Sequence, residues 1–305
     1  MSKYNEKQVI DQKGKKTTYL EWEGGTEKIL LLHGFPETPH IWEPIAHLLL
    51  EQGFTVIAPY LLGYEEVDKL DHVITIKELA EWLNAFVENI VENEDEKVFL
   101  VGHDFGAATS YAALAYKQHR FHNYIALAIP PLRSYLITIL THPILALRRR
   151  YILMFCLPFG IGRWLITRKN FTRLRKITVR WSEGATQSKA FFSSEDAFKH
   201  LPDLKGPLAL YRGLLPSFSK FFSWTTQFRL GFARINTPTR IFVGADETTY
   251  PAAVFDGFSA QFDPAIPVSL SVVPNCGHFI PFDAPELIVQ HILEMFQEYK
   301  KKEIA

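Results

Sequence analysis

The chain has 305 residues, of which 47% are hydrophobic and 22% charged; this composition is ordinary for a folded globular protein and excludes a disordered chain. Its 33 Lys and Arg residues balance its 33 Asp and Glu residues, so the net charge gives no reason to expect a nucleic-acid partner. No stretch reaches the ~18 uninterrupted apolar residues that a membrane-spanning helix needs, and the first residues lack the apolar run of a signal peptide. The two cysteines lie far apart, which fits a reducing compartment. We therefore expect a cytoplasmic protein without a transmembrane segment.

Charged residues are distributed unevenly along the chain. Residues 1–104 contain 9 Lys or Arg and 20 Asp or Glu, whereas residues 105–182 contain 13 Lys or Arg and no acidic residue. The simpler interpretation is that the basic residues are solvated and pair with acidic residues of the first part of the chain. Alternatively, Arg148–Arg150 beside the apolar stretches Ile144–Leu147 and Tyr151–Phe159 predicts peripheral contact with an anionic membrane surface.

Short apolar runs recur along much of the chain. Before them, Lys7–Asp11 and Thr17–Trp22 flank a Lys-Gly-Lys turn and predict an opening hairpin. The later runs are apolar at nearly every residue, which is typical of strands buried on both faces of a parallel sheet. They are Lys28–Leu32, Phe54–Pro59, Lys97–Val101, Tyr124–Ile129, Thr239–Val243 and Val268–Val273.

Helical patterns lie between most of these predicted strands. The clearest is Thr75–Val91, where Thr75 and Glu78 have the spacing of a capping box at the start of a helix. Strands that alternate with helices predict a doubly wound α/β sheet.

One interval interrupts the alternation of strands and helices. The stretch of about a hundred residues between the strands that end at Ile129 and begin at Thr239 is too long for a simple crossover. It is aromatic, basic and helix-like. We therefore predict a core formed by residues 1–130 and 236–305, with an inserted helical cap, or lid, at residues 131–235.

A candidate nucleophile follows one of the predicted strands, at the edge where ligands bind in open α/β sheets. There the chain reads Gly102-His103-Asp104-Phe105-Gly106, followed by an Ala-rich helix. Glycines on both sides allow the sharp strand-to-helix turn that lifts a central side chain, usually a serine, into a site. Asp104 is already ionised and suits attack on an sp³ carbon, which leaves an ester. The alternative is a structural Asp that caps the helix.

The loop Leu31–Glu37 follows another predicted strand. Its glycine lets the backbone approach closely, so the N–H groups of Phe35 and Phe105 are candidates for an oxyanion hole. We interpret His33 as a structural histidine that holds this loop rather than as a catalytic residue.

A candidate base and its acid follow the last two predicted strands. His278 lies in a loop near the C-terminal helix, while the neighbouring Cys276 is interpreted as a packing residue. A catalytic histidine needs a carboxylate to fix its tautomer and stabilise its charge, and Asp246 and Glu247 both follow the preceding strand. The resulting order of nucleophile, acid and histidine is the order expected for such a sheet.

Three motifs resemble one known group of enzymes. His33-Gly-Phe-Pro36, Gly102-His-Asp-Phe-Gly106 and Gly277-His278 are similar to motifs of the α/β-hydrolase superfamily, in the branch of epoxide hydrolases and haloalkane dehalogenases. The resemblance covers the predicted core from about Lys28 onward and is patchy in the predicted cap. It implies an α/β-hydrolase fold and a carboxylate nucleophile, with no metal or organic cofactor.

The same resemblance ranks the two candidate acids. The family's Gly-x-x-acid-x-x-x-Pro motif aligns on Gly244 and Pro251 without a gap. This alignment favours Glu247, although a slip of one residue in the loop would restore Asp246.

Epoxide hydrolases use two cap tyrosines to hold and protonate the epoxide oxygen. Leu210-Tyr-Arg-Gly213 resembles the motif that carries one of them, so Tyr211 is the candidate, with a purely structural aromatic residue as the alternative. Tyr151–Pro158 resembles the helix that carries the second, but Met154 stands at its position. Tyr151 lies one turn away on the same helix face and is the candidate replacement.

The resemblance implies that the chain opens a small apolar epoxide to a vicinal diol through an ester on Asp104, which water activated by His278 hydrolyses. A haloalkane dehalogenase is one alternative, although the Phe105 side chain lacks the indole N–H with which the family's tryptophan binds halide at this position. A non-catalytic binding protein on the same scaffold is another, motivated by Met154 and by the departure of Ala58–Gly63 from the family pattern.

Overall fold

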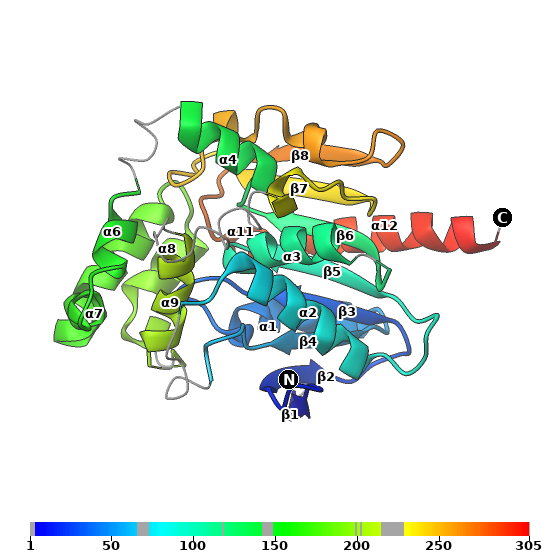
Figure 1. Cartoon of the computed structure of the whole chain (residues 1–305), viewed down its shortest axis with the longest axis horizontal. Helices are drawn as coiled ribbons and strands as arrows, with labels where there is room; N and C mark the ends of the chain where they lie inside the picture. Colours follow the sequence, from blue (N-terminus) through cyan, green and yellow to red (C-terminus); the bar gives the residue numbers. More distant parts are fainter. Residues whose placement is uncertain are drawn as a thin grey trace.

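An eight-stranded sheet, mostly parallel, organises the protein (Figure 1). A computed structural model describes residues 4–65, 73–117, 119–141, 149–198, 200–201, 203–214 and 229–304. The strands are β1 (Asn5–Ile10), β2 (Lys16–Trp22), β3 (Lys28–Leu32), β4 (Thr55–Pro59), β5 (Val98–His103), β6 (Phe121–Leu127), β7 (Thr239–Gly244) and β8 (Val268–Val273). Their order is β1-β2-β4-β3-β5-β6-β7-β8; β2 is antiparallel to both of its neighbours, and the other pairs are parallel. The predicted opening hairpin and the parallel α/β sheet are confirmed.

Helices cover both faces of the sheet. On one face, α1 (Glu43–Glu51) packs beside α12 (Pro285–Ile304), and their apolar side chains join one buried cluster with β5 and β6. On the other face, α2 (Ile76–Ile90) packs beside α3 (Phe105–Tyr116) in a second cluster (Figure 1). The predicted capping box is present at the start of α2, where Thr75 and Glu78 each accept from the other's backbone N–H.

A set of helices lies between β6 and β7 in the chain. They are α4 (Leu132–Thr141), α6 (Tyr151–Phe155), α7 (Ile161–Trp181), α8 (Gln187–Ser193), η3 (Glu195–Phe198) and α9 (Lys205–Leu214). In Figure 1, α6 to α9 lie together at one end of the sheet, away from the C-terminus. Non-helical backbone at Arg168–Phe171 divides α7 into two parts. Short helices complete the core: η1 (Pro39–Trp42), η5 (Ala252–Phe255), η6 (Phe258–Gln261) and α11 (Ile280–Asp283).

Two strands differ from the sequence-based expectation. β6 begins at Phe121 rather than Tyr124, because the polar residues that follow Phe121 are buried against α12, where the Asn123 amide donates to the Met295 carbonyl. The strand ends before Ala128, whose φ of 66° is incompatible with a strand. β8 lies at the edge of the sheet and is only half-buried, so burial on both faces was a wrong prediction for that strand. Among the described residues, no helix has the length and apolar character needed to cross a bilayer.

Candidate active site

Asp104 occupies a strained turn between β5 and α3. Its φ of 48° and ψ of −119° are unusual for a residue with a side chain, and such strain often accompanies functional sites. The carboxylate does not cap α3, which argues against the purely structural interpretation. A glycine is required opposite it, because a Cβ at Gly34 would lie 2.3 Å from the Asp104 Cβ.

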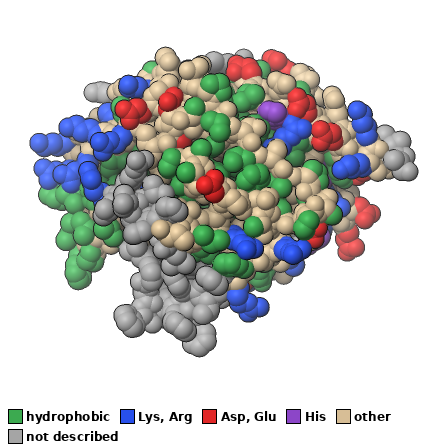
Figure 2. All heavy atoms as spheres, turned by 90° about the horizontal axis from the view of Figure 1, so that it is seen from above, with side chains coloured by type: hydrophobic (Ala, Val, Ile, Leu, Met, Phe, Trp, Pro, Cys, Tyr) green, Lys and Arg blue, Asp and Glu red, His purple; other side chains and the backbone are tan. Residues whose placement is uncertain are grey.

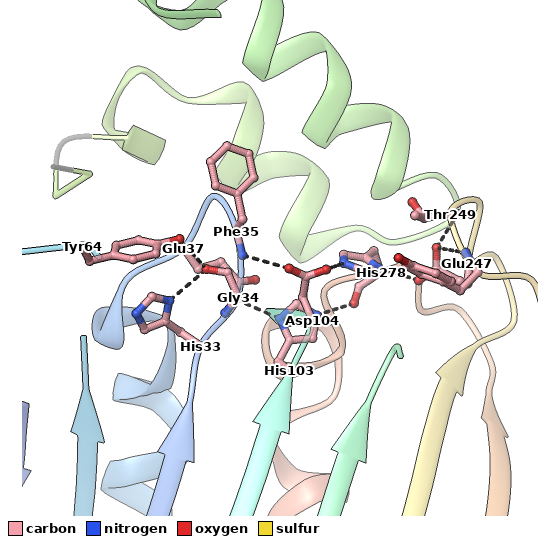
Figure 3. Close-up of polar contacts among 11 residues, drawn as sticks. His33, Gly34, Phe35, Glu37, Tyr64, His103, Asp104, Glu247, Thr249 and His278 are labelled. Atoms are coloured by element: carbon pink, nitrogen blue, oxygen red, sulfur yellow. Dashed lines mark hydrogen bonds and ion pairs between the residues drawn. The ribbon is translucent and has the colours of Figure 1, made fainter. Parts of the chain in front are cut away.

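The two carboxylate oxygens of Asp104 contact different loops (Figure 3). The Phe35 N–H donates to Oδ1 at 3.0 Å, and His278 Nε2 lies 3.2 Å from Oδ2. Burial alone would favour the protonated acid, but the hydrogen bond and charge of His278 outweigh it and hold the pKa of Asp104 below its usual value. Asp104 is therefore ionised at neutral pH, as a carboxylate nucleophile has to be.

His278 connects Asp104 with Glu247. Its Nδ1 lies 2.6 Å from Glu247 Oε2, while Glu247 Oε1 accepts from the backbone N–H groups of Thr249 and Tyr250 (Figure 3). The Asp246 side chain is exposed and lies against Gly184. Of the two candidate acids, Glu247 is therefore the one in contact with the histidine.

Two neighbouring carboxylates decide the charge of His278. Burial disfavours the charged ring, but Glu247 and Asp104 outweigh this effect and raise the pKa of His278 to about 10. The free site thus contains an imidazolium between two carboxylates. Removing the charge of either carboxylate would lower this pKa, so an ester on Asp104 would make the neutral form of His278, which can accept a proton, more populated near neutral pH.

The loop after β3 and the start of α3 bring backbone N–H groups close to Asp104. Besides the Phe35 N–H, the N–H of Phe105 is the first of α3 and has no acceptor within the helix. His33 is buried; its Nδ1–H donates to the Gly34 carbonyl and its Nε2 accepts from the Leu61 N–H. Burial lowers the pKa of His33 to about 3, so the ring is neutral and holds two loops together. These contacts support a structural role for His33.

A narrow pocket opens in front of Asp104, and the space in it that a water-sized sphere can reach is about 80 Å³. Four tyrosines, Tyr135, Tyr151, Tyr211 and Tyr250, line it together with apolar side chains. These apolar residues are Ile76, Phe105, Ala108, Ile129, Pro130, Leu132, Leu136 and Ile152. The lining suits a small, mainly apolar molecule that also carries an oxygen to be hydrogen-bonded.

Tyr211, on α9, packs against the two phenylalanines on either side of Asp104. Its ring centroid lies 5.1 Å from that of Phe35 and 4.8 Å from that of Phe105, both in edge-to-face geometry. Tyr151, on α6, lies 6.5 Å from Tyr211 between ring centroids. Burial raises the pKa of both phenols well above the usual value, so both remain protonated and able to donate. The sulfur of Met154 instead accepts from Arg173.

Two residues near the pocket were missed by the sequence analysis. Tyr250, three positions after Glu247, lines the pocket, and Arg149 stacks on it with its guanidinium carbon 4.8 Å from the ring centroid. Arg149 is only 4% exposed, so the expectation of a surface arginine is wrong there; Arg148 lies outside the described residues. The sequence does not indicate which of the three consecutive arginines is buried. Tyr250 could have been considered, because it directly precedes Pro251 in the motif that was used to choose Glu247.

Cys276 is buried, and burial raises the pKa of its thiol to about 12, in agreement with its interpretation as a packing residue. Within the described ranges, no three His, Cys, Asp or Glu side chains are grouped so that they could hold a metal ion.

This sheet, with functional side chains at the carboxyl ends of its strands, is that of an α/β hydrolase. The chain belongs to the alpha/beta hydrolase family, because the sequence profile of that family matches residues 29–291. The predicted resemblance to epoxide hydrolases is confirmed, because relatives and solved structures with that name are similar to the chain.

Several relatives and solved structures are similar to the chain. A Bacillus subtilis "AB hydrolase superfamily protein YfhM" is 29% identical over 60% of the chain and 61% of its own length. Epoxide hydrolase 3 of Xenopus tropicalis is 25% identical over 88% of the chain and 71% of its length. The structure of an epoxide hydrolase from Vigna radiata superimposes with a TM-score of 0.72 at 20% identity, covering 97% of the chain and 99% of that protein. At this identity the structural match establishes the fold alone.

Proposed function

We propose that the protein hydrolyses an epoxide to a vicinal diol in two steps, through an ester on Asp104. The observation that carries the proposal is the position of this ionised carboxylate, between the Phe35 N–H and His278 and at the base of a pocket lined by tyrosines. Similarity to two epoxide hydrolases over 88% and 92% of the chain, at 25% and 23% identity, supports the same activity.

In the first step, an Asp104 oxygen attacks one epoxide carbon and the C–O bond to the ring oxygen breaks. The ring oxygen takes a proton from Tyr211, assisted by a hydrogen bond from Tyr151, and becomes a hydroxyl group. The product is a hydroxyalkyl ester of Asp104 and a tyrosinate. The phenols suit this role because both are protonated at neutral pH and face the same pocket as the nucleophile.

In the second step, water hydrolyses the ester. Once esterification has removed the charge of Asp104, His278 loses a proton and can accept one from the attacking water, while Glu247 stabilises the imidazolium that re-forms. The N–H groups of Phe35 and Phe105 hold the oxyanion. Collapse of the tetrahedral intermediate breaks the ester C–O bond, the departing oxygen takes the remaining proton of the attacking water, and the diol and the Asp104 carboxylate are released. The proton that His278 lost after esterification passes through solvent to the tyrosinate and restores Tyr211.

We further infer that the helices between β6 and β7 act as a cap over this site, with domain limits near residues 131 and 235. Tyr151 and Tyr211 come from this segment, whereas Asp104, Glu247 and His278 come from the core. In Figure 3, helices of the segment lie above the strand ends that carry the labelled residues.

Intact mass spectrometry of a His278→Gln variant, mixed with a panel of epoxides and haloalkanes, tests the proposal. Without its base, the variant should accumulate the ester, with an added mass equal to the whole epoxide. A His278→Gln variant that also carries Asp104→Asn is the control and should form no adduct.

Two other outcomes would contradict the proposal. An adduct that has lost a halogen, without any epoxide adduct, would assign the protein as a dehalogenase, as a Sphingobium indicum haloalkane dehalogenase 31% identical over 35% of the chain suggests. No adduct, together with no turnover by the unmodified protein, would favour a binding protein.

A further inference from the structure

A ridge of exposed apolar side chains lies on α6, on the turn after it and at the start of α7. Leu153 is 63% exposed, Phe159 97%, Ile161 45% and Trp164 57%. α6 and α7 form the end of the molecule opposite the C-terminus (Figure 1). We refer to these four residues as the apolar ridge.

The apolar ridge contributes nothing evident to folding. Phe159 keeps almost its whole side chain in water and has a φ of 55°, a left-handed conformation that is unfavourable for a bulky residue. Apolar residues that stand singly on a surface need no explanation, but a group this close together marks an interaction surface. We therefore expect a binding partner that buries the apolar ridge.

The surroundings of the apolar ridge are basic. Arg150, Arg168, Lys169, Arg173 and Lys176 are exposed, and residues 149–182 contain no acidic residue. The left edge of Figure 2 shows Lys and Arg side chains next to hydrophobic ones. An apolar surface flanked by cations fits a partner that is apolar inside and anionic at its surface.

Trp164 combines an exposed apolar ring with a neighbouring cation. Its ring is exposed, and the Arg168 guanidinium carbon lies 4.5 Å from the ring centroid. Tryptophan prefers the interface between lipid headgroups and hydrocarbon, and arginine beside it can bind lipid phosphates.

We propose that this end of the protein docks on an anionic lipid bilayer. Phe159, Trp164 and Leu153 insert into the interface, and the exposed cations contact the headgroups. A second copy of the chain fits less well, because a symmetric contact through this surface would bring two basic patches together. The surface differs from the one expected from sequence, since Arg149 is buried and Phe155 packs inward.

The position of α6 gives this docking a consequence for substrate access. Tyr151 and Ile152 on α6 line the pocket, while Leu153 on the same short helix points into solvent. A helix with its side chains is about 10 Å across, so a molecule dissolved in the docked bilayer would start about one helix width from the pocket. Docking itself does not depend on the proposed catalytic activity.

Flotation of the full chain with vesicles tests the proposal. The protein should float with vesicles of phosphatidylcholine and phosphatidylserine, should float weakly with phosphatidylcholine alone, and should be released by salt. Replacing both Phe159→Asn and Trp164→Gln should lower the fraction bound at least about tenfold. Ile10→Asn with Val272→Gln is the matched control, because these residues are 65% and 52% exposed on the core.

A second pair of variants isolates the charge. Arg168→Gln with Lys169→Gln should lower binding to anionic vesicles about tenfold, since each surface cation contributes to attraction by anionic lipid. Lys301→Gln with Lys302→Gln removes two other exposed cations, at the end of α12, and should leave binding unchanged.

Two kinds of result would overturn the proposal. One is that no vesicle composition binds the unmodified protein, or that the control variants lose binding as much as the ridge variants do. The other is that the protein without lipid sediments as a dimer and Phe159→Asn with Trp164→Gln makes it monomeric, which would identify a second copy as the partner. Circular dichroism of each variant checks that it is folded, so a lost signal is not confused with unfolding.

Discussion

His103 Nε2–H donates to the backbone carbonyl of His278 at 2.8 Å, so the residue before the nucleophile holds the loop of the proposed base. On the other side of the ring, Nδ1 lies 2.9 Å from Glu37 Oε2, which also accepts from the Gly34 N–H (Figure 3). His103 and Glu37 are both buried. One buried set of contacts therefore fixes three loops: the one with the proposed oxyanion donors, the turn of Asp104 and the loop of His278.

Replacing His103→Phe should weaken this arrangement. The change leaves the His278 carbonyl without the His103 donor, and the Glu37 carboxylate keeps only the Gly34 N–H of the two contacts described. A buried group left unpaired costs about 1–3 kcal/mol. Urea unfolding should show the lost stability, and single-turnover kinetics should show slower hydrolysis of the ester.

The conservative variant His103→Gln separates positioning from simple packing. Its amide can still donate to the His278 carbonyl, so ester hydrolysis should recover in large part. Equal loss of activity in both variants would show that this hydrogen bond does not position His278.

Glu247→Gln should slow hydrolysis of the ester far more than Asp246→Asn. Glu247 contacts His278 Nδ1, and loss of its charge removes support for the imidazolium, at a cost of about a hundredfold or more in rate. Asp246 is exposed, so its variant should stay within about twofold of the parent protein. Quenched-flow mass spectrometry measures the rate at which the ester decays in each variant. If Asp246→Asn slowed this decay more than Glu247→Gln did, Asp246 would be the acid.

Tyr211→Phe should slow formation of the ester, whereas its hydrolysis should be unaffected. Loss of a general acid typically costs a factor of about 10² to 10⁴. Tyr151→Phe should have a smaller effect of the same kind, and Tyr116→Phe, on the far side of the core, should have none. If Tyr250→Phe instead shows the second large effect, Tyr250 and not Tyr151 assists Tyr211.

The pKa of His278 should differ between the free protein and the ester. In the free site, Glu247 and Asp104 raise this pKa to about 10, and esterification removes the charge of Asp104. The rate of ester hydrolysis should therefore rise with pH through an apparent pKa well below 10 and then level off. Stopped-flow fluorescence over a pH series measures it, and an apparent pKa that stays near 10 would contradict the proposed loss of coupling.

Acid should destabilise the fold partly through His122. This β6 side chain stacks on Tyr299 of α12, and burial lowers its pKa from 6.5 to about 3. Between these values the unfolded chain binds a proton that the folded chain does not, so stability falls as the pH falls. Relative to His122→Phe, the parent protein should lose about 2 kcal/mol between pH 7.5 and pH 5, as measured by urea unfolding at both values. An unchanged acid dependence would show that His122 does not titrate in this way.

Much of the core and of the proposed triad was predictable because both depend on local sequence. Buried parallel strands are continuous apolar runs, and Asp104 and Glu247 closely follow the runs of β5 and β7, whereas His278 follows the half-buried strand β8. The edge position of β8 depends on strand order, but Val268-Ser-Leu-Ser-Val-Val alternates in part between apolar and polar residues, a pattern that is typical of a half-buried strand. Contacts between distant segments, such as those of Arg149 with Tyr250, depend on packing and were missed for that reason.

The division of labour between the two parts of the chain makes the protein modular. Asp104, His278 and Glu247 belong to the scaffold, while Tyr151 and Tyr211 belong to the segment inserted between β6 and β7. In the proposed mechanism, exchange of that segment between relatives would change the substrate preference and the surface that the protein binds. The residues that hydrolyse the ester on Asp104 would stay the same. Mutational libraries for a new substrate are best confined to residues 131–235.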